Sequence, residues 1–273
     1  MAGFKLISLL LPMKLLNLPM LACAALVPVM AQLSAPNDNG VAMGHLHLTV
    51  RDVDAQKAFW TALGGIPVVN GRLQLIQFPG TFIMLRKGEP TGGTVGSVIN
   101  HLGFKVKSLE ESRVGWKAAG LKTEPGGNPK QMWLWAPDEI KVEMSEDASM
   151  TVPIASHHIH YYTPAVLEMQ AWYGKTFGAV PGKRGAFDAA DLPAINLSFT
   201  KSDAALPGTK GRALDHIGFE VKNLEAFLKK LEAAGVKIES PYRQLPNSTT
   251  AIAFLTDPWG TYIELTENLA PSK

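Results

Sequence analysis

Histidine is the residue type whose number and spacing in this chain best suit a chemical role. The 273 residues include seven histidines and one cysteine. A neutral imidazole can bind a divalent metal ion or accept a proton near neutral pH. One cysteine excludes an internal disulfide framework and a cysteine-rich zinc or iron–sulfur site. Any bound metal must therefore be held by nitrogen and oxygen atoms.

The histidines follow an internal repeat. Four similar stretches begin near residues 44, 100, 157 and 215. Their alignment places four histidines at one equivalent position, namely His45, His101, His158 and His216. In the first and third units a second histidine follows two residues later, at His47 and His160. Because side chains alternate along a strand, the two histidines of a unit should face the same way, and His157 the opposite way.

Two glutamates also recur. Residues 137–143 and 258–264 both begin with proline and end with glutamate, near the ends of the second and fourth units. Each glutamate lies between apolar residues of an expected strand and needs a partner if it faces inward. Two imidazoles and one carboxylate form a facial triad that leaves positions open on a divalent ion. Chain order predicts two such sets, which are His45, His101, Glu143 and His158, His216, Glu264.

Each unit has the same expected order of elements. An alternating apolar strand is followed by a helix, for which Ser108 and Asn223 are expected N-caps, and a glycine closes each helix. Further strand-like segments follow, at 72–78, 82–86, 131–135, 140–145, 185–187, 195–200, 251–255 and 261–266. The pattern predicts an α+β fold made of four β-α-β-β-β units.

The chain divides into several segments. Residues 1–31 hold two lysines, no acid and a short apolar run, which indicates a cleaved secretory signal and favours a secreted or periplasmic protein. The alternative is an uncleaved N-terminal anchor. A flexible linker is expected at 32–41, followed by two halves at 42–148 and 154–268 with a connection at 147–153. Each half holds two units.

Charge and hydropathy limit the classes of molecule that the protein is expected to bind. The formal net charge of +2, from 26 basic and 24 acidic residues, gives no electrostatic signal for nucleic acid. After residue 31 no apolar run is long enough to span a bilayer, so we expect no membrane association once the signal is removed. The sequence is compatible with a homo-oligomer. A small-molecule partner is therefore expected.

The sequence resembles the vicinal oxygen chelate superfamily, which includes glyoxalase I, fosfomycin-resistance proteins, bleomycin-resistance proteins and extradiol dioxygenases. The matching motifs are His-Ile-Gly-Phe-Glu-Val-Lys-Asn from His216 and Asp-Pro-Trp-Gly-Thr-Tyr-Ile-Glu-Leu from Asp257, with looser copies across 42–268. The resemblance implies units paired into two domains, each a sheet curled into a cup around a metal. It gives His45, His101, His158 and His216 the role of first-strand ligands, and Glu143 and Glu264 that of last-strand ligands.

One departure from the family pattern concerns a fourth ligand. Glyoxalase I enzymes typically carry an acid on the last strand of the odd-numbered unit, whereas residues 83–85 and 197–199 contain none. This favours the three-ligand pattern of extradiol dioxygenases and fosfomycin-resistance enzymes. The sequence does not show whether the cups form within the halves or across them.

The expected chemistry is Lewis-acid catalysis by a divalent cation, either Fe, Mn, Zn, Ni or Co, on a small organic substrate with two neighbouring oxygens. His47 and His160 would accept a proton, with a structural hydrogen bond as the alternative. Trp133 and Trp135 are expected to pack in the core rather than against an aromatic ligand. The alternatives in function are a metal-independent module that sequesters a small molecule, and one working half beside a half kept for structure.

Overall fold

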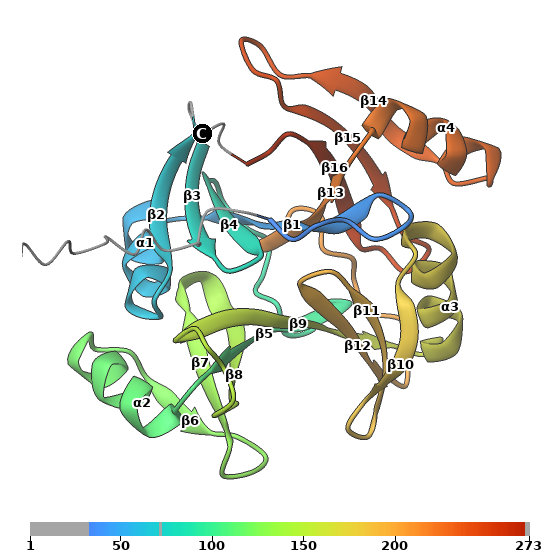
Figure 1. Cartoon of the computed structure of the whole chain (residues 1–273). Helices are drawn as coiled ribbons and strands as arrows, with labels where there is room; N and C mark the ends of the chain where they lie inside the picture. Colours follow the sequence, from blue (N-terminus) through green and yellow to red (C-terminus); the bar gives the residue numbers. More distant parts are fainter. Residues whose placement is uncertain (1–32, 71–72, 271–273) are drawn as a thin grey trace, which may run out of the picture.

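A computed structural model of the chain describes residues 33–70 and 73–270, which form two eight-stranded mixed sheets and four α-helices whose buried side chains join the core shared by the sheets (Figure 1). The predicted signal at 1–31 lies outside the described residues. Within the described ranges, no helix has the length and apolar character needed to cross a bilayer. The segment expected to be a linker is held to the fold, because the Asn37 side-chain amide donates to the carbonyl oxygens of Phe177 and Gly178 at 3.0 and 3.2 Å.

All four units have the predicted β-α-β-β-β order. Unit one contains β1 (Val41–Val50), α1 (Val53–Ala62), β2 (Ile66–Asn70), β3 (Leu73–Phe78) and β4 (Thr81–Lys87). Unit two contains β5 (Ile99–Val106), α2 (Leu109–Ala118), β6 (Thr123–Pro125), β7 (Gln131–Ala136), the short 3-10 helix η1 (Pro137–Glu139) and β8 (Ile140–Glu146). Unit three contains β9 (Ile154–Thr163), α3 (Val166–Phe177), β10 (Val180–Arg184), β11 (Phe187–Leu192) and β12 (Ile195–Lys201). Unit four contains β13 (Leu214–Val221), α4 (Leu224–Ala233), β14 (Ile238–Gln244), β15 (Ala251–Thr256) and β16 (Tyr262–Glu267).

Local sequence explains where the helices begin and end. The side chains of Ser108 and Asn223 accept hydrogen bonds from backbone N–H groups three residues later, at 3.2 and 3.0 Å, which confirms the predicted N-caps. Asp52 caps α1 in the same way. A glycine with positive φ follows each helix, at Gly64, Gly120, Gly178 and Gly235.

The strand directly after each helix was missing from the expected segments. These strands, β2, β6, β10 and β14, are the outer edges of the two sheets and are largely exposed, so they lack an alternating apolar pattern. Each contains a proline, which an edge strand tolerates, namely Pro67, Pro125, Pro181 and Pro241. The strand predicted at 185–187 is wrong, because Gly185 has a φ of 58° in the turn between β10 and β11.

The two sheets combine the units crosswise. Sheet A has the order β14-β15-β16-β13-β1-β4-β3-β2, so unit one pairs with unit four. Sheet B has the order β10-β11-β12-β9-β5-β8-β7-β6, so unit two pairs with unit three. At each centre the first strands of two units run antiparallel, β1 with β13 and β5 with β9. The halves 42–148 and 154–268 therefore each supply one unit to each sheet.

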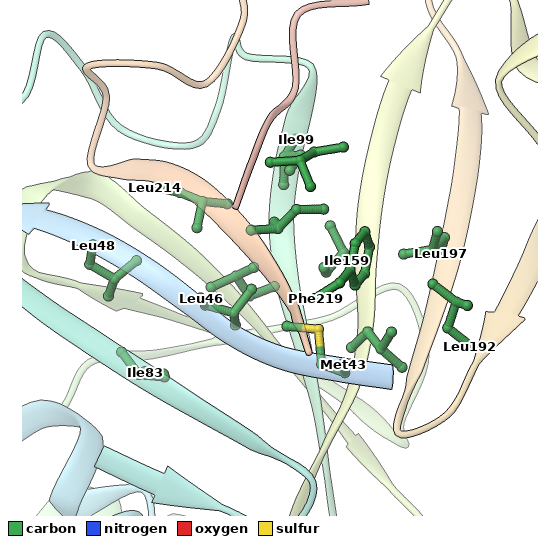
Figure 2. Close-up of a cluster of buried hydrophobic side chains, with 14 of the residues drawn as sticks. Met43, Leu46, Leu48, Ile83, Ile99, Ile159, Leu192, Leu197, Leu214 and Phe219 are labelled. Carbon is green, nitrogen blue, oxygen red and sulfur yellow. The ribbon is translucent and has the colours of Figure 1, made fainter. Parts of the chain in front are cut away.

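The larger of two hydrophobic clusters contains residues of both sheets. Figure 2 shows Leu46 and Leu48 of β1 near Ile99 of β5, Ile159 of β9 and Phe219 of β13. Because side chains alternate along β1, the histidines next to these leucines lie on the opposite face of sheet A. The strands that build the core thus also present the histidines away from it.

Candidate metal-binding sites

Two groups of histidine and glutamate could each hold a metal ion in the described part of the chain. Site A consists of His45, His47, His216 and Glu264, and site B consists of His101, Glu143, His158 and His160. Within each group the donor atoms lie within 4.8 Å of one another. The six residues predicted as ligands therefore come together, but the predicted sets were wrong. The reason is that β1 hydrogen-bonds with β13 and not with β5.

A local two-fold relation between the central strands shapes each site. In sheet A, His45 lies opposite Gly218, and His47 lies opposite His216. In sheet B, His158 lies opposite Gly103, and His160 lies opposite His101. A Cβ atom on Gly218 or Gly103 would collide with the facing imidazole ring. A glycine two residues after the first histidine of one unit thus makes room for a histidine of its partner unit.

Glu264 joins the histidines of site A. One of its oxygens, Oε2, lies 3.0 Å from His45 Nε2 and 2.9 Å from His216 Nε2, and the carboxyl is buried. Burial alone would raise the pKa of Glu264, but hydrogen bonds from His216 and His45 hold it well below its usual range. The Asp215 carboxylate accepts from His216 Nδ1 at 2.6 Å. Although burial opposes the charge, these two carboxylates raise the pKa of His216.

His47 differs from the other histidines of site A in the hydrogen bonding of its ring nitrogens. Within the described ranges, neither its Nδ1 nor its Nε2 has a hydrogen-bond partner, and the same holds for His45 Nδ1. Burial, reinforced by repulsion from His216 and His45, lowers the pKa of His47 to about 2, so the ring is neutral. Buried imidazole nitrogens without a partner suit a divalent cation or a substrate. The donor set of site A therefore fits a metal ion.

Site A opens into a cavity of about 440 Å³. His47, His216 and Glu264 contribute to its lining, and Arg86 and Lys210 lie at the same cavity. The apolar part of the lining comprises Leu73, Met84, Leu245, Ile252, Phe254 and Leu269, together with the ring of Tyr262. The rings of Phe254 and Tyr262 stack with centroids 5.1 Å apart, and both lie edge-on to His216. The cavity thus combines a polar base with largely apolar walls.

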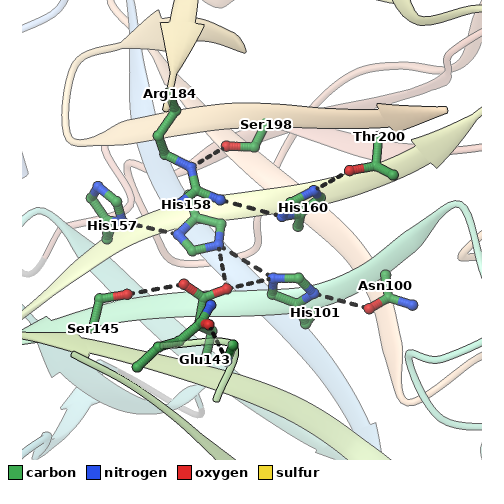
Figure 3. A network of polar contacts seen from close by, with 12 residues as sticks. Asn100, His101, Glu143, Ser145, His157, His158, His160, Arg184, Ser198 and Thr200 are labelled. Carbon is green, nitrogen blue, oxygen red and sulfur yellow. Dashed lines mark hydrogen bonds and ion pairs between the residues drawn. The ribbon is translucent and has the colours of Figure 1, made fainter. Parts of the chain in front are cut away.

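Site B has similar donors with a different hydrogen-bond network (Figure 3). Glu143 Oε2 lies 3.1 Å from His101 Nε2 and 3.6 Å from His158 Nε2, while Ser145 donates to the other carboxylate oxygen at 2.9 Å. The side-chain oxygen of Asn100 lies 2.9 Å from His101 Nδ1, where site A has Asp215. Burial lowers the pKa of His158 to about 4 and also lowers that of His101.

Arg184 of β10 reaches into site B. Its Nε donates to Ser198 Oγ at 2.6 Å, and its Nη2 lies 3.3 Å from His160 Nδ1, as Figure 3 shows. The other nitrogen of His160 lies 2.8 Å from Thr200 Oγ1. Burial, together with the charges of His101, His158 and Arg184, lowers the pKa of His160 to about 2. In contrast to His47, His160 therefore has a partner at both nitrogens.

Comparison with known proteins identifies the family. A family model described as the Glyoxalase/Bleomycin resistance protein/Dioxygenase superfamily matches residues 42–265. The chain belongs to this superfamily. The resemblance inferred from the sequence motifs is thereby confirmed, while a search of curated proteins finds no match.

Solved structures support the fold of this superfamily. Glyoxalase I from Zea mays is 17% identical, with a TM-score of 0.67 and coverage of 84% of this chain and 92% of the maize chain. A putative dioxygenase from Bacillus subtilis subsp. subtilis str. 168 is 13% identical, with a TM-score of 0.63 and coverage of 88% and 87%. At these identities the likeness shows the fold alone. The predicted α+β architecture of paired β-α-β-β-β units is confirmed.

The strand registers show which residues of units one and three occupy the position that a glutamate occupies in units four and two. Glu264 lies beside Gly218, and the equivalent position beside His47 is Met84. In sheet B, Glu143 lies beside Gly103, and the equivalent position beside His160 is Ser198. Units one and three thus lack the glutamate and carry a second histidine on the neighbouring strand.

His157 does not point away from site B as predicted. Its Nδ1 lies 2.9 Å from His158 Nδ1. The register between β5 and β9 shifts here, since Gly103 pairs with His158 but Phe104 pairs with Ser156. The irregularity leaves His157 unpaired in the ladder and breaks the simple alternation.

The prediction of core packing for two tryptophans was wrong. On β7, Leu134 faces the core, while Trp133 is half-buried with its ring 4.9 Å from that of His101. Trp135 is 38% exposed. The Lys141 ammonium lies 3.8 and 5.9 Å from the ring centres of Trp133 and Trp135. Both tryptophans therefore stand on the face of sheet B that carries site B.

Sequence reasoning missed Asp215, Asn100 and Arg184. The first two directly precede a repeat histidine, so the alignment that found the histidines could also have shown this difference between the units. Arg184 lies on an edge strand outside every expected segment, and nothing in its local sequence indicates that it reaches His160.

Proposed function

We propose that the chain is a metal-dependent enzyme whose reaction takes place at site A. The observation that carries this proposal is the neutral His47, which lies at the 440 Å³ cavity beside His216 and Glu264 and has no hydrogen-bond partner in the part of the chain that the structure describes. The donor set of imidazoles and a carboxylate accepts a divalent cation such as Fe, Mn, Zn, Ni or Co. The reaction belongs with those of dioxygenases, lyases or isomerases on a small oxygenated molecule.

His45, His216 and Glu264 would hold the ion, and Asp215 would fix the ring orientation of His216 through its 2.6 Å hydrogen bond. When bound, the ion polarises two neighbouring substrate oxygens and lowers their pKa. His47 then accepts a hydrogen bond from the substrate at the ring nitrogen that carries no hydrogen, and so orients the substrate. Its burial beside the other rings keeps this nitrogen available.

The cavity walls indicate the kind of substrate. Stacked Phe254 and Tyr262, with the neighbouring aliphatic side chains, favour a small and largely apolar molecule with a flat face. Arg86 and Lys210 at the cavity favour a substrate with a partial or full negative charge at one end. Catechols, enediolates and α-hydroxyketones combine neighbouring oxygens with this size.

We also propose that the protein is exported. The apolar segment before residue 32, with its basic residues and no acid, supports removal by signal peptidase and a secreted or periplasmic location.

Metal analysis and a substrate screen test the proposed function together. The protein is loaded in turn with each of the five metals and assayed with catechols, enediolates and α-hydroxyketones. We expect metal-dependent turnover that is lost in Glu264→Gln and kept in the matched variant Glu143→Gln. If no metal binds above background under any loading condition, the enzyme proposal is overturned, and a module that sequesters a small molecule without metal takes its place.

A further inference from the structure

The two sites hold the same donor residues in opposite electrostatic surroundings. In site A two carboxylates, Glu264 and Asp215, contact the histidines. Arg86 lies 3.9 Å from Asp215, but its side chain is 60% exposed to solvent. In site B the position of Asp215 is taken by the neutral Asn100. Site A is therefore the more negative of the two, and a divalent cation favours it.

A cation of the protein itself already lies in site B. The guanidinium of Arg184 is 3.3 Å from His160. Burial lowers its pKa from a very high ordinary value while the Glu143 charge raises it, and a guanidinium is charged near neutral pH. Its charge reaches the other rings as well, since it contributes to the low pKa of His158 and of His101. A divalent ion at these donors would meet this fixed positive charge in a buried setting.

The position of Arg184 is built into the sheet. Ser198, whose side chain accepts from Arg184 Nε at 2.6 Å, is fully buried and donates in turn to Asn196 at 2.6 Å. The ring of Phe187 lies 5.3 Å from the guanidinium carbon. Ser198 occupies the place equivalent to Met84 of site A, where a thioether offers no comparable acceptor. Ser198 thus supplies the hydrogen-bond acceptor that positions the Arg184 guanidinium.

We propose that site B is not a second metal site and that Arg184 serves as its tethered cation. The guanidinium balances the buried Glu143 carboxylate, excludes a divalent ion and leaves site A to bind one metal ion per chain. The network of site B then joins units two and three as a structural element, because its imidazoles are satisfied by protein partners. This inference rests on the part of the proposed function that concerns metal binding, and it does not require catalytic turnover.

Counting metal ions tests this proposal directly. The full chain is titrated with Zn²⁺ and with Co²⁺ by calorimetry, and its metal content is measured by mass spectrometry. We expect one ion in the wild type, none in Glu264→Gln and two in Arg184→Met, which removes the charge but keeps most of the volume. The double variant Glu264→Gln with Arg184→Met should bind one ion, now in site B, with a changed cobalt absorption spectrum.

A matched control comes from the neighbouring residue on β10. Lys183 is exposed and paired with Asp188, so Lys183→Met removes a positive charge of the same strand without touching site B and should leave the count at one. If Arg184→Met does not fold, Arg184→Gln replaces it, with folding checked by circular dichroism. Two ions of equal affinity in the wild type, or a count that stays at one in the folded Arg184 variants, would overturn the proposal. A single bound ion without turnover on any substrate would instead contradict the proposed function alone.

Discussion

Site A and site B lie on equivalent strands of the repeated units, yet the residues around them differ at a few positions. In site A the histidine His47 has no hydrogen-bond partner among the described residues and faces a cavity, whereas in site B the equivalent His160 is bonded to Thr200 and Arg184. The ligands themselves do not distinguish the two sites. The comparison teaches that two equivalent donor sets can differ in the hydrogen bonding of one histidine because the neighbouring residues differ.

The largest difference is expected when the glutamate of each site is removed. Glu264→Gln should weaken metal binding by more than about 100-fold and abolish turnover, because it removes a buried carboxylate charge that lies against both His45 and His216. Glu143→Gln should change neither by more than about twofold. Metal affinity by competition with a chelating dye measures both variants. Equal losses in the two variants would remove the functional distinction between the sites.

The second comparison concerns the extra histidines. His47→Ala should lower kcat by about 100-fold, because it removes a hydrogen bond that orients the substrate, with little loss of stability, because the His47 nitrogens have no hydrogen-bond partner within residues 33–70 and 73–270. His160→Ala should keep kcat but destabilise the fold by about 1 kcal/mol, since it breaks contacts with Thr200 and Arg184. Steady-state kinetics and urea unfolding separate the two effects. A loss of kcat in His160→Ala larger than that in His47→Ala would reverse the assignment.

A smaller effect should follow from the residue before each repeat histidine. Asp215→Asn gives site A the neutral partner that Asn100 supplies in site B, and should weaken metal binding by about 10-fold to 100-fold. The kcat of the fully loaded variant should fall less than its metal affinity. Because asparagine keeps the acceptor oxygen, an unchanged affinity would show that hydrogen-bond geometry alone positions His216.

The smallest expected effect is on the pH dependence of folding in the metal-free protein. Burial lowers the pKa of His47 and of His160 to about 2 and that of His158 to about 4, all from 6.5. These histidines bind protons more readily when unfolded, so stability should fall as the pH drops below 6.5. His216 has a raised pKa, so its contribution is present below pH 6.5 and is lost as the pH rises through the folded value.

Urea unfolding between pH 7 and 5 checks this contrast between His216 and the histidines with a lowered pKa. The unfolding equilibrium constant of the wild type should rise by about tenfold or more between pH 6.5 and 5. His160→Gln should reduce this acid sensitivity, and His216→Gln should increase it. The same slope in all three proteins would show that the pKa values of His160 and His216 are not shifted in opposite directions.

The repeat made the donors predictable but not their grouping. Equivalent positions revealed His45, His101, His158 and His216, since each opens a strand of alternating apolar residues. The grouping of the units depends on which first strands hydrogen-bond with each other, and this is decided by packing between distant parts of the chain. No local pattern encodes that β1 lies against β13.

The edge strands and Arg184 escaped prediction for a related reason. An exposed edge strand such as β10 carries no apolar alternation, and Arg184 becomes informative only when β10, β11 and β12 bring it over Ser198. Similarly, a register shift in β9 redirects His157, which a regular alternation cannot anticipate. Sequence patterns report on repeated and buried positions, and these features are neither.

The crosswise pairing of units has a consequence for the order of folding. The parts of site B are close in sequence, with His101 42 residues from Glu143 and 57 from His158, so its loops close at low entropic cost. Site A requires His45 to meet Glu264 across 219 residues. During synthesis sheet B can form while β13 and β16 are still missing, and β1 must wait for them. Site A, where we propose that the chemistry takes place, therefore cannot be complete until the last strand of the chain, β16, has been synthesised.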